Sequence, residues 1–481
     1  MSQTLARILV FFTSAAILVI EIVAGRLLAP YVGVSLEVFT AIIGVILAGI
    51  SLGAWLGGKV ADRVDPTLLP GPLLIAGGVL ALVSPLVVQL VGPAAGGSPG
   101  SIVVVTALAF FAPAAVLAAV TPVVVKIRLT TLAETGSVVG GYSAIGTAGA
   151  IVGTFVTGFF LIASFPTRPI VAGVGVLLIL GGSWLIISRS RWATVAVAAM
   201  GCLSAFAVAT SDGPCLYETT YHCADVLVDE ARPSGRILVL DRGHNSYVDL
   251  EDPTYLDFRY TNVMADVIDV DLEEGPLDVL SIGGGGFTFP HYLDATRPGT
   301  SHTVLEIDGD LETIAQTHLG FTDQADVIAG DARATIAAIP DDSVDLVIGD
   351  AFSGYTVPWH LTTVEFNEIV NSKMRSDGIY VINVIDEGGL DFARAAASTF
   401  RGVFEHVAVI APPEYLAGLD GGNFVIVGSQ AELELNAILD RIRSRGGIEN
   451  AIEGTQLDEF IGSAPILRDD FAPVDQMLSS G

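Results

Sequence analysis

The residues most suited to chemistry lie between Asp278 and Asp308, in the stretch DVLSIGGGGFTFPHYLDATRPGTSHTVLEID. The short apolar run DVLSI is followed by four consecutive glycines, Gly283, Gly284, Gly285 and Gly286. After a helical segment, a second apolar run, HTVLEID, carries Glu306 and Asp308 at its end. Glycines permit a tight turn and a close approach to a ligand, and an acid roughly 20 residues later can accept hydrogen bonds from ribose hydroxyls. The pattern predicts a strand–turn–helix–strand unit that binds a nucleoside.

The spacing of the glycines limits which nucleoside ligands the turn could bind. In the dinucleotide fingerprint G-x-G-x-x-G, the third glycine would fall at Thr288 or Phe289. No Lys-Ser/Thr pair follows, so a P-loop is excluded as well. A glycine turn with a ribose-binding acid and no phosphate cradle favours S-adenosylmethionine or a relative, bound as a co-substrate and not as a tightly held cofactor. The alternative is a βαβ unit whose glycine turn holds no ligand.

Two further acids end later apolar runs, Asp331 in AGDAR and Asp350 in VIGDAFSG. Together with the backbone of Ala332, Asp331 is placed to accept a hydrogen bond from an adenine amino group. Asp350 would lie near the sulfonium, where a carboxylate can orient a cationic amine and take its proton. For both acids the alternative is a helix N-cap, a position that aspartate favours.

The elements that must position these acids alternate between apolar strands and amphipathic helices. The strands are DVLSI, TVLEI, ADVIAG, VDLVIGD, GIYVINVI, HVAVIA and NFVIVG. This alternation predicts an α/β doubly wound, Rossmann-like domain of the methyltransferase type at 271–481, with ligands beyond the carboxyl ends of its strands. A small β unit is expected at 213–270. The acidic C-terminal tail shows a helix, ELELNAILDRIRSR, and no recognisable chemistry.

Composition divides the chain into two dissimilar halves. Of 481 residues, 51% are hydrophobic, and the mean hydropathy is +0.63. Residues 1–212 contain six of the 52 acids and nine of the 23 Lys and Arg residues. The remainder of the chain is therefore strongly acidic and would repel phosphates, so no nucleic-acid partner is expected.

Residues 1–212 are predicted to form a transmembrane helical domain with about seven spans. Apolar stretches of roughly the ~20 residues needed to cross a bilayer lie at about 8–30, 36–58, 69–92, 102–125, 137–163, 169–187 and 192–210. The first stretch contains Glu21 and Arg26, which indicate either a substrate or ion site or a structural polar clamp. Gly53 with Gly57, and Gly149 with Gly153, have the small-xxx-small spacing of tightly packed helices.

The side of the membrane that holds the acidic half is left open by the sequence. With seven spans, Arg7, Lys59–Arg63, Lys126–Arg128 and Arg189–Arg191 share one side, which places the N-terminus in the cytoplasm and residues 213–481 outside. Cys215 and Cys223, which could pair as a disulfide in an oxidising compartment, agree with that placement. A nucleoside co-substrate made in the cytoplasm does not. No cysteine has the spacing of a metal site, so no metal is expected.

From about 215 to 430 the chain resembles the spermidine synthase, or polyamine aminopropyltransferase, family. The matching motifs are LYETTYH, RILVLDRGHNSYVDLEDPTYLDFRYTNVM, IGGGG, LEID, GDAR, VDLVIGDAF and PWHLTTVEF, in the family's order. The membrane half, with EIVAGRLLAP and GTAGAIVGTF, resembles the multi-pass modules fused to such domains in some prokaryotes. The resemblance implies a multi-pass protein of the cell membrane that transfers an aminopropyl group from decarboxylated S-adenosylmethionine to putrescine or a related amine, with Asp350 as proton acceptor. It places Glu306 and Asp331 on the nucleoside.

The chain departs from the family's pattern wherever the amine would bind. His222 follows Tyr221 in place of Gln, and Tyr260-Thr261 replaces a Tyr-His pair. Gly286 and Ser353 replace two acids. Loss of two carboxylates weakens the case for putrescine as the acceptor.

Two other functions therefore remain under consideration. The first is methyl transfer from intact S-adenosylmethionine to a membrane or exported substrate, because the acid that would repel the carboxylate of that co-substrate is replaced here by Gly286. The second is a non-enzymatic transporter or polyamine sensor that works through Glu21 and Arg26. Besides the small-molecule amine and the lipid bilayer, a second copy of the chain in a homodimer is considered as a partner.

Overall fold

The computed structural model describes residues 1–95, 98–187, 191–211, 213–322, 325–352, 354 and 356–479, without the side chains of 191–193 and 479. The chain divides into two compact units, Met1–Ala224 and Asp225–Gly481, which are described separately. We propose that the limits expected from the sequence, 1–212, 213–270 and 271–481, mark separable domains.

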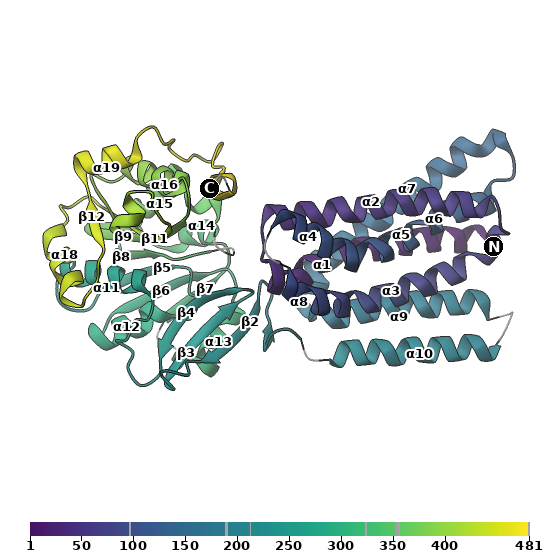
Figure 1. Cartoon of the computed structure of the whole chain (residues 1–481), viewed down its shortest axis with the longest axis horizontal. Helices are drawn as coiled ribbons and strands as arrows, with labels where there is room; N and C mark the ends of the chain where they lie inside the picture. Colours follow the sequence, from purple (N-terminus) through teal and green to yellow (C-terminus); the bar gives the residue numbers. More distant parts are fainter. Residues whose placement is uncertain are drawn as a thin grey trace. The chain divides into compact units, whose positions relative to one another are not determined.

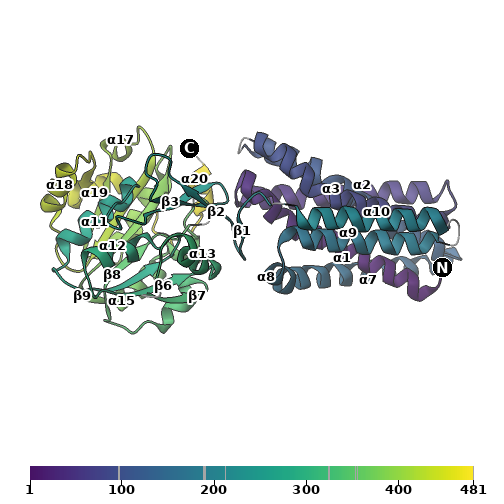
Figure 2. The same cartoon turned by 90° about the horizontal axis from the view of Figure 1, so that it is seen from below.

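The first unit is a bundle of helices whose long members lie side by side (Figures 1 and 2). The helices are α1 (Gln3–Val32), α2 (Leu36–Ala61), α3 (Pro70–Val91), α4 (Pro99–Thr106), α5 (Ala112–Ala118), α6 (Val120–Arg128), α7 (Thr135–Val156), α8 (Ile162–Ser164), α9 (Thr167–Ile186) and α10 (Arg191–Thr210). Six segments are long and apolar enough to cross a membrane: Gln3–Val32, Leu36–Ala61, Pro70–Ala94, Pro99–Arg128, Leu132–Ser164 and Thr167–Ile186. The seventh predicted stretch forms α10, whose apolar part, Thr194–Thr210, is shorter.

Small residues bring the helices of this bundle together, as their spacing predicts. A Cβ on Gly53 or Gly57 of α2 would overlap the backbone of Ala115 or Ala119, respectively. Gly149 and Gly153 of α7 approach the backbone of α1 in the same way, at Phe11 and Ala15. Only glycine allows such close contact between helix backbones, so the small-xxx-small prediction is confirmed.

The two charged residues of the first helix have different surroundings. Arg26 donates to the carbonyl oxygen of Thr219 and lies 3.8 Å from the Glu218 carboxylate. Glu218 also accepts a 2.8 Å hydrogen bond from the backbone N–H of Thr167 at the start of α9. Arg26 thus ties α1 to the segment after α10, which fits a structural clamp. Among the described residues, Glu21 has no such partner.

A four-stranded antiparallel sheet follows, formed by β1 (Tyr217–Glu218), β2 (Cys223–Val228), β3 (Gly235–Leu240) and β4 (Gly243–Asp249) in that order. A disulfide joins Cys215 to Cys223 across the β1–β2 hairpin. This pairing, which the sequence left open, closes the loop that contains LYETTYH.

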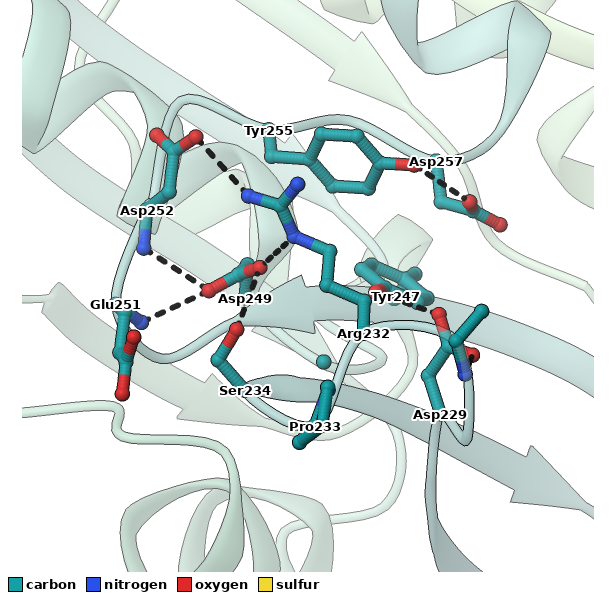
Figure 3. Close-up of polar contacts among 12 residues, drawn as sticks. Asp229, Arg232, Pro233, Ser234, Tyr247, Asp249, Glu251, Asp252, Tyr255 and Asp257 are labelled. Carbon is teal, nitrogen blue, oxygen red and sulfur yellow. Dashed lines mark hydrogen bonds and ion pairs between the residues drawn. The ribbon is translucent and has the colours of Figure 1, made fainter.

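A polar network fixes the far end of this sheet (Figure 3). Asp249, at the end of β4, accepts from Arg232, from Ser234 at 3.0 Å and from the backbone N–H groups of Glu251 and Asp252 at 2.9 Å. Burial opposes the charge on Asp249, but these donors outweigh it and lower its pKa to about 2. The network holds the turn that leads from the small sheet toward the larger one.

The second sheet has eight strands in the order β12-β10-β11-β9-β8-β5-β6-β7. Its strands are β5 (Asp278–Ile282), β6 (Ser301–Glu306), β7 (Ala325–Ala329), β8 (Val344–Gly349), β9 (Met374–Asp386), β10 (His406–Ala411), β11 (Gly422–Ser429) and β12 (Asn450–Ile452). The five neighbouring strands β9, β8, β5, β6 and β7 are parallel to one another. The strands β11, β10 and β12 are added to β9 by antiparallel pairing. The doubly wound prediction is confirmed, and all seven predicted strands are present.

Helices cover both faces of this sheet because side chains alternate along the strands. In β9, Tyr380 and Val384 pack into one buried cluster with α15 (Val364–Lys373), α16 (Asp391–Arg401) and α19 (Gly454–Ile461). Ile379 and Val381 pack into the other, with helices α11 (Arg259–Asp271), α12 (Thr288–Thr296) and α18 (Leu435–Ser444). The remaining helices of the unit are α13 (Asp310–His318), α14 (Ala332–Thr335), α17 (Pro413–Leu416) and α20 (Val474–Ser479).

Candidate active site

The glycine turn joins β5 to α12 and lies beside the end of β8. Gly283 and Gly285 have φ values of +94° and +50°, which side chains disfavour. A Cβ on Gly283 would come within 2.6 Å of the Asp350 carbonyl oxygen. The backbone N–H of Asp350 in turn donates to Ile282 at 2.9 Å. The turn and Asp350 are therefore immediate neighbours, as the order of parallel strands requires.

Glu306 closes the turn from the end of β6. Its carboxylate accepts from the backbone N–H of Gly284 at 2.7 Å and of Gly285 at 3.2 Å, and from that of Asp308 at 2.9 Å. Only 6% of Glu306 is exposed. A carboxylate has about four lone-pair positions, so capacity remains for a ribose hydroxyl after these three bonds. Glu306 therefore also stabilises the glycine turn through backbone hydrogen bonds, a role that was not predicted from the sequence.

The fourth glycine of the turn faces the small sheet. The N–H of Gly286 donates to Ser246 Oγ at 2.8 Å, and a Cβ on Gly286 would come within 2.6 Å of Ser246 Cβ. A side chain at 286 would thus require Ser246 of β4 to move. Ser246 occupies the space that an acid at position 286 would need. This role of Ser246 was not predicted from the sequence.

Asp350 is held by two donors on opposite sides of its carboxylate. Tyr260 Oη donates to Oδ2 at 2.9 Å, and Asn383 Nδ2 donates to Oδ1 at 3.0 Å. Burial raises the pKa of Asp350 to about 6, although hydrogen bonds from Asn383 and Tyr260 counteract the rise. A carboxylate with this pKa is ionised near neutral pH and is basic enough to take a proton, which suits a general base.

Asn383 belongs to a short hydrogen-bonded relay across the sheet. Its side-chain oxygen accepts a 2.9 Å hydrogen bond from Asn423 Nδ2 at the start of β11. This bond fixes which way the Asn383 amide points, so that its NH₂ group faces Asp350. Neither asparagine was predicted. The feature that could have identified them is an asparagine within each of the apolar runs GIYVINVI and NFVIVG.

The predicted amine-binding residues occupy different places. Tyr260 lies against Asp350, and burial and that carboxylate raise its pKa well above its usual value, so it stays a proton donor to Asp350. Thr261 is 4% exposed, and its hydroxyl donates to the Phe258 carbonyl at 2.7 Å, inside the first turn of α11. Tyr221 and His222 belong to the first unit, in the β1–β2 turn. Ser353 lies outside the described residues.

Asp331 follows β7 by two residues and is the N-cap of α14. Its Oδ1 accepts from the N–H groups of Arg333 at 2.9 Å and Ala334 at 3.3 Å. Its Oδ2 lies 2.7 Å from His360 Nε2, and since a carboxylate only accepts, that nitrogen carries the proton. The helix-cap alternative therefore applies to Asp331, and adenine would share this carboxylate with His360. The neighbouring Ala332 is buried.

The fold and these residues define a class of protein. A glycine turn after the first parallel strand, acids at the ends of the next three strands and helices on both faces make the second unit a Rossmann-like domain of the methyltransferase type. No protein-family model matches the chain.

Comparison with known proteins places the chain within that class. It is 30% identical over 162 residues to a polyamine aminopropyltransferase of Vibrio vulnificus (strain CMCP6), which covers 33% of this chain and 52% of that protein. It is 26% identical over 141 residues to a polyamine aminopropyltransferase of Chromobacterium violaceum, covering 29% and 53%. The chain thus spans about half the length of each of these two relatives.

A solved structure extends the similarity. A probable spermidine synthase from Corynebacterium glutamicum ATCC 13032 matches with a TM-score of 0.50 and 27% identity, over 53% of this chain and 96% of that one. The C-terminal half of the chain is therefore similar to proteins of the spermidine synthase/polyamine aminopropyltransferase family. It follows an N-terminal region with six long apolar helices.

Proposed function

We propose that this protein is a membrane-bound transferase that moves the aminopropyl group of decarboxylated S-adenosylmethionine to an amine. The observation that carries the proposal is the placement of Asp350. This buried carboxylate lies directly beside the glycine turn, and Tyr260 and Asn383 hold both of its oxygens. The relatives named polyamine aminopropyltransferases support the same reaction.

In this reaction the lone pair of the amine attacks the methylene carbon bonded to the sulfonium. The new C–N bond forms as the C–S bond breaks, and the electron pair of that bond leaves with sulfur in neutral methylthioadenosine. The nitrogen loses one proton, which Asp350 accepts. A carboxylate here also stabilises the positive charge shared by the two reactants.

The other site residues would hold the nucleoside and orient the base. Glu306 would bind the ribose with the capacity left by its bonds to the glycine turn, and Asp331 would accept from adenine beside His360. Tyr260 and Asn383 keep the Asp350 carboxylate directed into the site. The amine acceptor is a small polyamine or a relative whose second ammonium does not depend on acids at positions 286 and 353.

Methyl transfer from intact S-adenosylmethionine is the second candidate, because one observation favours it. Ser246 fills the space beside Gly286, so no carboxylate stands there to repel that of an intact co-substrate. The two candidates differ in the co-substrate preferred, and calorimetry of the purified protein with each form separates them. Tighter binding of the carboxylated form would favour methyl transfer.

The proposal is tested by incubating the purified full-length protein with decarboxylated S-adenosylmethionine and putrescine, agmatine or spermidine. Mass spectrometry should find methylthioadenosine and an aminopropylated amine in equal amounts. Asp350→Asn should abolish both products, whereas Asp377→Asn, at an exposed aspartate of β9, should leave them unchanged. Product formation by Asp350→Asn at the wild-type rate would refute the assigned role.

We further propose that the enzyme resides in the cell membrane, anchored by the first unit. Six segments of this unit have the length and apolarity of membrane spans. Fractionation of cells should therefore recover the activity in washed membranes, and release by alkaline carbonate would contradict an integral anchor.

A further inference from the structure

The segment that follows α19, from about residue 463 to 474, is built into the domain. Leu467 is fully buried, its N–H donates to Thr399 Oγ1 at 2.9 Å, and its carbonyl oxygen accepts from Val364 at 2.9 Å. The N–H of Asp469 donates to Glu365 Oε2 at 3.1 Å. These bonds place the segment against the start of α15.

Asp469 uses this position to bind Arg333, two residues beyond Asp331. Both of its oxygens accept from the Arg333 guanidinium, one of them at 2.7 Å, and Thr363 donates to it at 2.8 Å. The Arg333 guanidinium holds the pKa of Asp469 below its usual range. A two-bond arginine–carboxylate pair fixes orientation as well as distance.

Arg333 connects Asp469 to Asp331, both directly and through His360. Its guanidinium donates to the His360 carbonyl oxygen at 2.8 Å, while its backbone N–H donates to Asp331 Oδ1 at 2.9 Å. The His360 ring reaches the other oxygen of Asp331 at 2.7 Å. One oxygen of Asp331 is thus held by Arg333 itself and the other by His360, whose backbone Arg333 contacts, and the Arg333 guanidinium is held by Asp469.

We propose that Asp469 is a positioning residue of the nucleoside site, which orients the Asp331 carboxylate toward adenine through Arg333 and His360. This inference rests on the proposed function and deepens it. The C-terminal segment then belongs to the co-substrate site, although it lies more than 130 residues after the acid that it positions.

The affinity of the purified full-length protein for methylthioadenosine, measured by calorimetry in detergent, tests the inference. Asp469→Asn should weaken binding about tenfold, within the range of couplings seen in shared hydrogen-bond networks. Its melting temperature should stay close to that of the wild type. Asp470→Asn, which removes the same charge from the adjacent exposed position, should bind like the wild type, and Asp469→Glu should recover part of the affinity.

A double-mutant cycle separates positioning from a merely structural role. In an Asp331→Asn background, Asp469→Asn should cause little further loss, because its effect passes through Asp331. The inference is overturned if Asp469→Asn binds like the wild type, or if its loss is the same in both backgrounds. Nucleoside binding without any aminopropylated product would instead overturn the proposed function alone, and a wild-type protein that binds no nucleoside would overturn both.

Discussion

Replacement of Asp350 by asparagine should abolish activity and at the same time stabilise the protein. Burial raises the pKa of Asp350 from an ordinary 3.8 to about 6, so the folded state binds this proton more tightly than the unfolded state. Wild-type stability therefore falls as pH rises from about 4 to about 6, and the difference corresponds to about 3 kcal/mol. Asparagine keeps an acceptor for Asn383 and avoids the buried charge. For a domain of this size the gain is about 6–10 °C in melting temperature at pH 8.

The assay is thermal unfolding of the full-length protein in detergent at pH 8, 6 and 4, paired with product formation. The gain of Asp350→Asn over the wild type should be largest at pH 8 and nearly vanish at pH 4, where the carboxyl is protonated in the folded state and about half protonated in the unfolded state. Asp377→Asn, at an exposed site on β9, controls for the loss of net charge. Equal or lower stability of Asp350→Asn at pH 8 would refute the claim that a buried charge is maintained there for catalysis.

Four further predictions concern the base, the glycine turn, the disulfide and the membrane bundle. The wild-type kcat/KM should fall as pH decreases through about 6, because Asp350 must be ionised to accept the proton; a flat profile from pH 5 to 8 would contradict this. Gly286→Asp should lower the melting temperature, measured by scanning calorimetry, because its side chain collides with β4, and unchanged stability would contradict that packing. Maleimide labelling of the denatured, unreduced protein should modify one of the three cysteines, rising to three when the Cys215–Cys223 bond is reduced; three labels before reduction would exclude the bond. Gly53→Ala should destabilise the purified bundle by about 1–3 kcal/mol through overpacking, while Gly44→Ala, which meets open space, should not.

Much of the fold could be predicted because the pattern of apolar residues indicates where the strands and helices lie. The runs that form β5 to β11 are continuous and lie between amphipathic helices, as expected for strands buried on both faces. The short strand β12, at Asn450–Ile452, could not be predicted, because three residues without alternation carry no periodic signal. The antiparallel pairing of β11 between β9 and β10 is likewise invisible to local pattern.

The candidate site was only partly predictable. Strand-end acids follow from topology, so Glu306, Asp331 and Asp350 could be named from sequence. Apart from Tyr260, the residues that hold these acids could not be named, because Asn383, His360 and Asp469 become their neighbours only through packing. The C-terminal segment, which reads as a featureless acidic tail, contains one of these partners.

The central claim is that the aminopropyl carbon, and not the methyl carbon, leaves the sulfonium. The most direct measurement uses decarboxylated S-adenosylmethionine with ¹³C in its methyl group, incubated with the purified protein and a diamine and analysed by mass spectrometry. Aminopropyl transfer predicts that all of the ¹³C remains in methylthioadenosine, while the amine gains an unlabelled aminopropyl group. Appearance of ¹³C on the acceptor would show methyl transfer and contradict the claim.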